Sequence, residues 1–200
     1  DNSLINEYKK EYADILSKLP DLPFSNAWIA KQTTKVLPNN SILHLGILNS
    51  LRNWNFFEIS PTIECYSNTG GFGIDGIVST VIGASLANRN KLYFCVVGDL
   101  AFFYDLNSLG NHNIGTNLRI LLINNGCGTE FKNYNHFAAK FGEDANEYMA
   151  AQGHYGYKSK ELVKHYSTDL GFKYLSASNK DEYLSNLDEF VNPDIGNSSI

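Results

Sequence analysis

Two short apolar runs, each ended by small polar residues, constrain the fold of this chain more than any other feature. The runs are Leu92–Val97 and Leu118–Ile123, followed by Gly98-Asp99 and by Asn124-Asn125-Gly126. Such runs are typical of strands buried on both faces of a parallel sheet. About twenty residues separate them, which is enough for a crossover helix, so both strand ends are expected at one edge of the sheet.

Asp99 and Asn125 are therefore expected to lie close together, where open α/β sheets bind ligands. A carboxylate, an amide oxygen and a backbone carbonyl make half of the octahedral oxygen shell that Mg²⁺ prefers, with phosphates and water completing it. Gly126 and Gly128 let backbone groups approach a ligand. The alternative, from the residues alone, is a pair of ordinary turns in which Asp99 and Asn125 cap helices.

The composition of the 200 residues, 43% hydrophobic and 18% charged, fits one globular domain. The net charge of −5 and the lack of a Lys/Arg cluster argue against a nucleic-acid partner. No apolar run reaches membrane-spanning length. A polar N-terminus and three cysteines without a pairing pattern predict a cytoplasmic protein with reduced thiols. The first residue is not Met and residues 197–200 read like a starting strand, so we expect one domain of a longer protein.

Helical and strand patterns alternate along the chain. They predict an α/β fold with a doubly wound, mostly parallel sheet and helices on both faces. Helices are expected at 3–18, from Ser25 or Asn26 to about 35, 75–87, 159–170 with Ser159 as N-cap, and 180–191. Strands are expected at 42–47, 62–66, 92–97, 118–123 and 172–175. Residues 132–158 have no strong period and are expected to form a binding lid or an insertion with short helices.

Residues 71–76, GFGIDG, match the dinucleotide-binding fingerprint G-x-G-x-x-G. They follow an expected strand and open an expected helix, and Asp99 lies 23 positions after Gly76. This interpretation predicts NAD binding. It gives no reason for Gly98 or for Asn124-Asn125-Gly126.

Gly98-Asp99, with Asn124-Asn125 after the next strand, resembles the diphosphate-binding motif of thiamine-diphosphate enzymes. Residues 67–80 (SNTGGFGIDGIVST), residues 98–107 (GDLAFFYDLN) and Asn49-Ser50-Leu51 are similar to one branch, the SEPHCHC synthases of menaquinone biosynthesis. The resemblance runs from about Asn49 to Phe131. It implies the thiamine-diphosphate-binding fold and a C-terminal domain of a multi-domain enzyme.

The resemblance also implies a role for individual residues. Mg²⁺ would be bound by Asp99, the side-chain oxygen of Asn125 and the Cys127 carbonyl. Backbone at Leu100 and Ala101 would hold the diphosphate at a helix N-terminus, and Ile74 would be the wedge that brings the two cofactor rings together for catalysis. The full set of implied cofactor contacts is Asn49, Ser50, Gly73, Ile74, Gly98, Asp99, Leu100, Ala101, Asn125, Cys127 and Phe131.

The implied reaction is decarboxylation of a 2-oxo acid with transfer of the resulting carbanion equivalent to an acceptor. The synthases carry arginines for acidic substrates where this chain has Thr69 and Trp54, or a shifted Arg52. Glu130 replaces an apolar residue and would repel a dicarboxylate or tricarboxylate. Glu130 is also a candidate acid or base, and the alternative is a solvated loop charge.

The same resemblance implies a partner. The glutamate that protonates the cofactor's pyrimidine would come from a pyrimidine-binding domain of the same or a partner subunit, in a homodimer or tetramer. Alone, these 200 residues are expected to bind cofactor weakly and to be inactive. Two alternatives stay open: a nicotinamide dehydrogenase-type domain, and a non-catalytic subunit that keeps the fold. His136 and His154 are candidates to reach substrate.

Overall fold

A computed structural model describes residues 2–133, 135–154, 159, 161–194 and 196–200. Its centre is a four-stranded sheet made of β1 (Ile42–Leu45), β2 (Glu64–Tyr66), β3 (Tyr93–Gly98) and β4 (Leu118–Ile123). The strand order is β2-β1-β3-β4, and all three neighbouring pairs are parallel. The predicted α/β fold with a mostly parallel sheet is confirmed.

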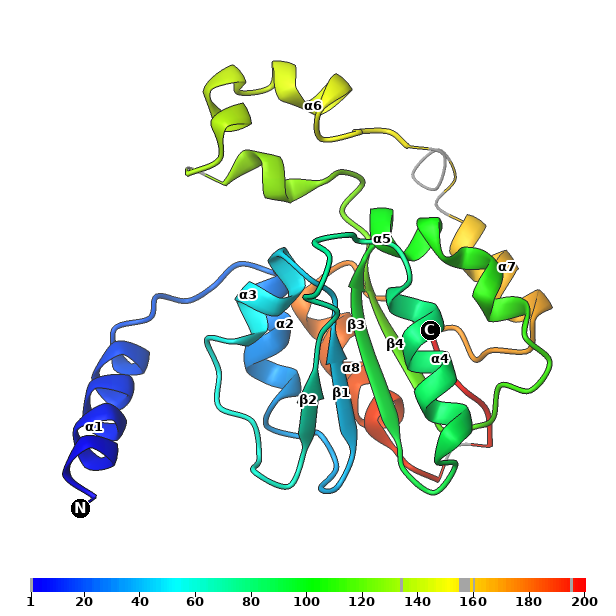
Figure 1. The fold of residues 1–200 in the computed structure, drawn as a ribbon, viewed down its shortest axis with the longest axis horizontal. Helices are drawn as coiled ribbons and strands as arrows, with labels where there is room; N and C mark the ends of the chain where they lie inside the picture. Colours follow the sequence, from blue (N-terminus) through cyan, green and yellow to red (C-terminus); the bar gives the residue numbers. More distant parts are fainter. Residues whose placement is uncertain (1, 134, 155–158, 160, 195) are drawn as a thin grey trace.

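Apolar side chains of the sheet alternate between two hydrophobic cores, because successive residues of a strand point to opposite faces. In β3, Cys95 and Val97 belong to one core, and Phe94 and Val96 belong to the other. Helices α4 (Ile77–Ala87), α5 (Asp99–Tyr104) and α7 (Leu162–Asp169) cover the first face. Helices α2 (Asn26–Thr33), α3 (Asn49–Trp54) and α8 (Lys180–Val191) cover the second (Figure 1). Helices on both faces make the fold doubly wound, as predicted.

Local signals explain where several helices begin and end. Ser25 caps α2 and Asn179 caps α8, and each side chain accepts a hydrogen bond from the backbone N–H three residues later. Helix α4 begins at Ile77, two residues later than predicted, because Gly76 adopts the left-handed conformation with φ of 73°. Gly171, with φ of 83°, ends α7.

Two predictions about helices are wrong. The connection from β3 to β4 is not one helix but the short α5 followed by the 3₁₀ turn η1 (Leu106–Gly110). Helix α7 begins at Leu162 with Glu161 at its N-cap, so Ser159 does not cap it. A third element, α3, was not predicted, because its six residues are too few to carry a helical period and Leu48 before it has φ of 72°.

Two predicted strands are shorter than expected, and a third is replaced by a single β-bridge. The strands expected at 42–47 and 62–66 shorten to β1 and β2. Residues 172–175 form no separate strand. Lys173 instead makes a parallel bridge to Ser199, which also bridges to Arg119 of β4. The chain therefore continues the sheet beyond β4 with two short extended pieces.

Helix α1 (Ser3–Ser17) is the predicted first helix, but it lies outside the two cores. None of its residues is buried, and Figure 1 shows it beside the sheet at the end of an extended link. The Tyr12 hydroxyl fastens it by donating to the Phe56 carbonyl at 3.1 Å and accepting from the Glu58 N–H at 2.8 Å.

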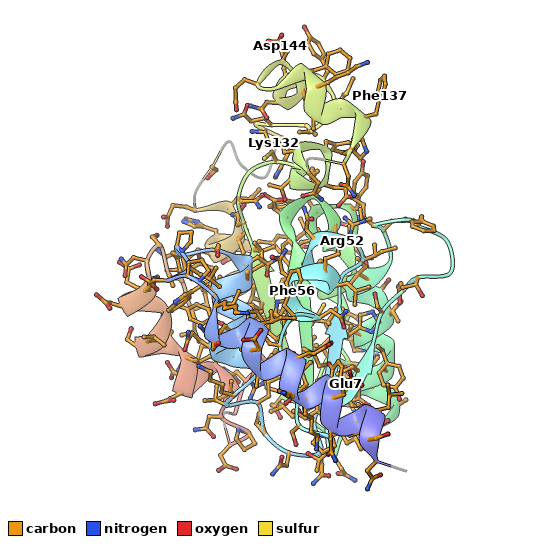
Figure 2. The ribbon with its side chains drawn as sticks, turned by 90° about the vertical axis from the view of Figure 1, so that its left-hand side faces the viewer. Glu7, Arg52, Phe56, Lys132, Phe137 and Asp144 are labelled. Carbon is orange, nitrogen blue, oxygen red and sulfur yellow. The ribbon has the colours of Figure 1, made fainter. Side chains whose placement is uncertain are left out.

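The segment from residue 129 to residue 154 projects beyond the carboxyl edge of the sheet (Figures 1 and 2). It consists of short turns of helix: η2 (Thr129–Lys132), η3 (Phe137–Phe141) and α6 (Asp144–Tyr148). This matches the prediction of an insertion with short helices. Residues 155–158 of the predicted lid lie outside the described residues. Within the described chain, every helix is too short or too polar to cross a membrane.

Candidate functional site at the carboxyl edge of the sheet

The ends of β3 and β4 meet at Asp99. Asp99 is the first residue of α5 and is 2% exposed. One carboxylate oxygen accepts a hydrogen bond from the Gly126 N–H, and the other accepts from the Leu100 N–H at 2.8 Å. Because Gly126 directly follows Asn125, the two strand ends come together as the topology predicted.

The turn after β4 is shaped by its own hydrogen bonds. Gly126 has φ of 81°, a left-handed conformation that glycine adopts without strain. The exposed Asn125 accepts the Cys127 N–H on its side-chain oxygen at 3.4 Å, and the Cys127 carbonyl accepts the Thr129 N–H at 3.0 Å. A carbonyl oxygen has a second lone pair, so that of Cys127 keeps the capacity to bind an ion. Burial, and to a smaller degree the Asp99 carboxylate, raises the pKa of the Cys127 thiol, which keeps the thiol protonated at neutral pH.

The end of the 129–154 segment folds back over this turn. The Gly128 N–H donates to the Ala150 carbonyl at 2.6 Å, and the Gly153 N–H donates to the Gly126 carbonyl at 3.2 Å. His154 then places its Nε2 atom 3.3 Å from a carboxylate oxygen of Asp99. His154 is, with His136, a predicted candidate to reach substrate, but no signal in the sequence indicates that it lies beside Asp99, 55 positions away.

A second polar cluster lies between α3 and η2. Asn49 donates through its side-chain amide to the Thr129 hydroxyl at 2.7 Å and accepts from Asn133 at 3.2 Å. Arg52 forms an ion pair with Glu130, to which Asn133 also donates at 3.1 Å. The Glu130 side chain is 18% exposed and that of Arg52 is 52% exposed. Glu130 is therefore a paired and mostly buried carboxylate rather than a solvated loop charge.

The resemblance places either Trp54 or Arg52 where the synthases carry a substrate-binding arginine. The two side chains lie in different environments. Trp54 is fully buried in the core, where its indole N–H donates to Asn26 at 3.2 Å. Arg52 lies at the carboxyl edge below the projecting segment (Figure 2). Only Arg52 is placed to meet a ligand at this edge.

The other predicted contact residues are divided between two loops. Gly73 and Ile74 lie in the loop between β2 and α4, where Ile74 packs on the core and a Cβ on Gly73 would collide with the Asp75 carboxylate. Phe131 lies next to Gly128 and packs edge-on against His136, with ring centroids 5.1 Å apart. Among the remaining residues, Ser50 and Ala101 are buried and Gly98 precedes α5.

The strand order weighs against the dinucleotide-binding interpretation. The loop at residues 71–76 follows β2, which is an edge strand, whereas Asp99 follows β3. Strand β1 lies between them. In the dinucleotide fold the acidic residue follows the strand adjacent to the glycine-rich turn, where it reaches the ribose of the same nucleotide.

Within the described residues, no group of three or more His, Cys, Asp and Glu side chains is arranged to hold a metal ion. The expected Mg²⁺ shell is of another kind, because only Asp99 would contribute a side chain of these types and Cys127 would contribute its backbone carbonyl. Its amide and carbonyl oxygens come from the turn that contacts Asp99.

Comparison with known proteins identifies homologues of this chain. No protein-family model matches the chain. Among the relatives found, three that are each named 2-succinyl-5-enolpyruvyl-6-hydroxy-3-cyclohexene-1-carboxylate (SEPHCHC) synthase illustrate the similarity. The protein of Bacteroides fragilis is 40% identical over 127 residues, covering 62% of this chain and 23% of the relative. The protein of Phocaeicola vulgatus is 33% identical over 176 residues, which cover 88% of this chain and 30% of the relative. The protein of Bacteroides thetaiotaomicron is 31% identical over 192 residues, which cover 95% of this chain and 33% of the relative. The chain is therefore a homologue of the SEPHCHC synthases and spans a third of their length or less.

Proposed function

We propose that the chain forms the diphosphate- and Mg²⁺-binding domain of a thiamine-diphosphate-dependent enzyme. The reaction is decarboxylation of a 2-oxo acid with transfer of the carbanion equivalent to an acceptor. The observation that carries the proposal is the hydrogen bond from Gly126 to Asp99, which joins the two halves of the diphosphate-binding motif. Homology to the SEPHCHC synthases over most of the chain supports it.

The residues present fit a magnesium ion that bridges to a diphosphate. Asp99, the amide oxygen of Asn125 and the Cys127 carbonyl are hard oxygen donors on two adjacent strand ends. In the described chain, the buried Asp99 carboxylate accepts two backbone N–H groups, the His154 imidazole lies 3.3 Å from it, and no Lys or Arg is paired with it. A bound cation would therefore compensate its negative charge.

Thiamine diphosphate, when bound, supplies the electron sink for loss of carbon dioxide. We assign to residues of this chain the binding and orientation of the cofactor. Backbone at Leu100 and Ala101 would hold the diphosphate, a backbone carbonyl near Gly73 would hold the pyrimidine, and Ile74 would be the wedge against the two cofactor rings. The further proposed contacts are Asn49, Ser50, Gly98 and Phe131.

The Arg52–Glu130 ion pair supports the proposal that the substrate is not a dicarboxylate or tricarboxylate. Glu130 already compensates the charge of Arg52, so this part of the edge offers little attraction to a second carboxylate of a substrate. Glu130 is also our candidate for an acid or base at the reaction centre. The acceptor and the 2-oxo acid therefore differ, in this proposal, from those of the synthases.

A pyrimidine-binding domain, from the same or a partner subunit, would complete the site. We propose a homodimer or tetramer, because the activating glutamate would come from outside these 200 residues. We propose a cytoplasmic location because the three cysteines are free thiols. Without that domain the chain should bind the cofactor weakly and decarboxylate nothing.

Isothermal titration of the chain with thiamine diphosphate, with and without Mg²⁺, tests the proposal. We expect binding only with Mg²⁺, and at least about tenfold weaker binding for Asp99→Asn. Asp144→Asn, which removes an exposed carboxylate on α6, is the matched control and should bind as the parent chain does. Binding of NAD without Mg²⁺ would support the dinucleotide alternative instead. Absence of Mg²⁺-dependent binding, even with a pyrimidine-binding domain supplied, would favour a non-catalytic subunit.

A further inference from the structure

The Arg52–Glu130 ion pair at the carboxyl edge of the sheet keeps part of its hydrogen-bonding capacity. The contact joins Nη1 of Arg52 to Oε2 of Glu130, and the Asn133 side chain donates to the same Oε2 at 3.1 Å. Within the described residues, the guanidinium Nε and Nη2 atoms and the second carboxylate oxygen, Oε1, make no hydrogen bond. The pair therefore offers donors and an acceptor to a ligand.

Asn49 links this ion pair to the turn that carries the proposed metal ligands. Its side-chain amide donates to Thr129 at 2.7 Å and its side-chain oxygen accepts from Asn133 at 3.2 Å, so it holds residues on both sides of Glu130. The Thr129 N–H in turn donates to the Cys127 carbonyl at 3.0 Å. Continuous hydrogen bonds thus place the ion pair beside the proposed cofactor site.

A carboxylate is a poor ligand for this pair. Glu130 already compensates the charge of Arg52, so a second anion would have to displace it. Displacement would leave the mostly buried Glu130 carboxylate without its cation, which is unfavourable. A cationic ligand meets the same difficulty at Arg52. An uncharged ligand can bind while the ion pair stays intact.

Hydroxyl groups match the atoms that the pair leaves available. A hydroxyl donates one hydrogen bond and also accepts, and hydrogen bonds to an ionised partner are stronger than those between neutral groups. Two hydroxyls on adjacent carbons can use both partners at once, because one donates to Oε1 of Glu130 while the other accepts from the Arg52 guanidinium. Two hydroxyls that are far apart in the ligand cannot do so.

We propose that the Arg52–Glu130 pair binds adjacent hydroxyl groups of an uncharged substrate, as a sugar or another polyol presents them. The inference rests on the proposed function, because it names the class of acceptor that this edge of the site takes. Figure 2 shows Arg52 at this edge, below the projecting segment. The intact ion pair orients the hydroxyls, and the acceptor binds between it and the turn after β4.

NMR of the arginine Nε–H groups tests the proposal without cofactor or metal. The chain has three arginines, Arg52, Arg89 and Arg119, so the signals can be assigned by Arg→Lys variants. The probes are three four-carbon compounds at constant ionic strength: erythritol, butane-1,4-diol and succinate. We expect erythritol to shift the Arg52 signal saturably and to bind at least about tenfold more tightly than the other two. Arg89, which donates to the Asn113 carbonyl, is the internal control and should not respond.

Glu130→Gln should reverse the preference between the probes. A neutral amide no longer compensates the Arg52 guanidinium, so succinate should bind at least about tenfold more tightly than it binds the parent chain, and erythritol more weakly. Glu161→Gln is the matched control variant, because it removes an exposed carboxylate that is paired with Lys164 on α7. It should leave the binding of both probes unchanged.

Tighter binding of succinate than of erythritol to the parent chain would overturn the proposal, and this comparison needs no variant to fold. Equal shifts at Arg52 and Arg89 would also overturn it, because the polyol would then act on any exposed guanidinium. The proposed function is tested separately. A chain that binds thiamine diphosphate with Mg²⁺ but prefers succinate keeps that function and loses this inference, whereas one that prefers erythritol but never binds thiamine diphosphate loses the function and keeps the polyol site.

Discussion

The four-stranded sheet and the 129–154 segment differ in what holds them in place. The strands bury apolar side chains on both faces, between two layers of helices. The segment instead exposes much of its apolar surface, including Phe137, Tyr148 and Met149. Polar contacts hold it at its two ends: the Arg52–Glu130 cluster at the start and the contact between His154 and Asp99 at the finish.

The difference indicates that the sheet and the segment have separate roles at the proposed site. The strand ends hold Asp99 and the turn at Gly126 in a fixed position, whereas the 129–154 segment above them is attached by a few hydrogen bonds. Regions with few buried apolar contacts open at lower free energy than core strands do. Ligand entry should therefore proceed through movement of the segment, and the sheet should stay unchanged.

Two phenylalanines give the sharpest test of this comparison. Phe102 of α5 is fully buried, and Phe137 of η3 is 73% exposed. Phe102→Ala should lower the free energy of unfolding by about 3–5 kcal/mol through loss of core packing. Phe137→Ala should lower it by at most about 1 kcal/mol, including its contact with the Lys140 ammonium. Urea unfolding measures both, and equal losses would mean that the segment is packed as firmly as the sheet.

Two glycines should respond in opposite directions. Gly126→Ala puts a side chain at φ of 81° and should destabilise the chain by about 1–2 kcal/mol. Gly83→Ala, in the middle of α4 with open space around it, should stabilise the chain by about 0.5–1 kcal/mol. Thermal unfolding of the two variants gives the sign directly. A neutral Gly126→Ala would show that the turn rearranges freely and does not hold a fixed geometry.

Much of the fold could be predicted from the sequence because it depends on local signals. Apolar runs bounded by Gly98-Asp99 and Asn124-Asn125 identified the two long strands, and Ser25, one of two expected caps, marked the start of α2. Short elements gave no such signal. Helix α3 has six residues, and its start depends on the left-handed backbone of Leu48.

The site was predictable only where its parts follow strand ends. Topology brings Asp99 to the turn after β4, and this followed from the parallel arrangement. The ion pair of Arg52 with Glu130 and the approach of His154 to Asp99 join residues 78 and 55 positions apart through irregular segments. No periodicity reports such contacts, so they required the structure.

A histidine of the sheet gives a pH-dependent test. Burial lowers the pKa of His44 in β1, partly offset by a hydrogen bond with Asn68. In the unfolded chain the His44 imidazole is protonated below about pH 6.5, whereas in the folded chain it is protonated only at lower pH. Stability from His44 is therefore complete above about pH 6.5 and is lost as the pH falls through the lower folded-state pKa, by at most about 1.4 kcal/mol per pH unit.

His44→Gln should therefore flatten the acid side of the stability profile between about pH 7 and pH 5. His112→Gln, at an exposed turn, is the control. Urea midpoints across this range measure the slope. Parallel profiles for the parent chain and His44→Gln would contradict the assignment of a neutral, buried imidazole to the sheet.

The ion pair at the base of the segment should give the smallest effect. A double-mutant cycle with Arg52→Gln and Glu130→Gln should yield a coupling of up to about 1 kcal/mol, because Arg52 is half exposed but Glu130 is mostly buried and also accepts from Asn133. The pair Glu161–Lys164 on α7, exposed on both sides, should yield about 0.5 kcal/mol or less. Added salt should weaken the α7 pair more strongly, since its charges are better screened. If the Arg52–Glu130 coupling is no larger than that of the α7 pair, the segment is held mainly by its other end. There Ala150 and Gly153 bond to the turn at residues 126–128 and His154 contacts Asp99, so opening should begin at Glu130.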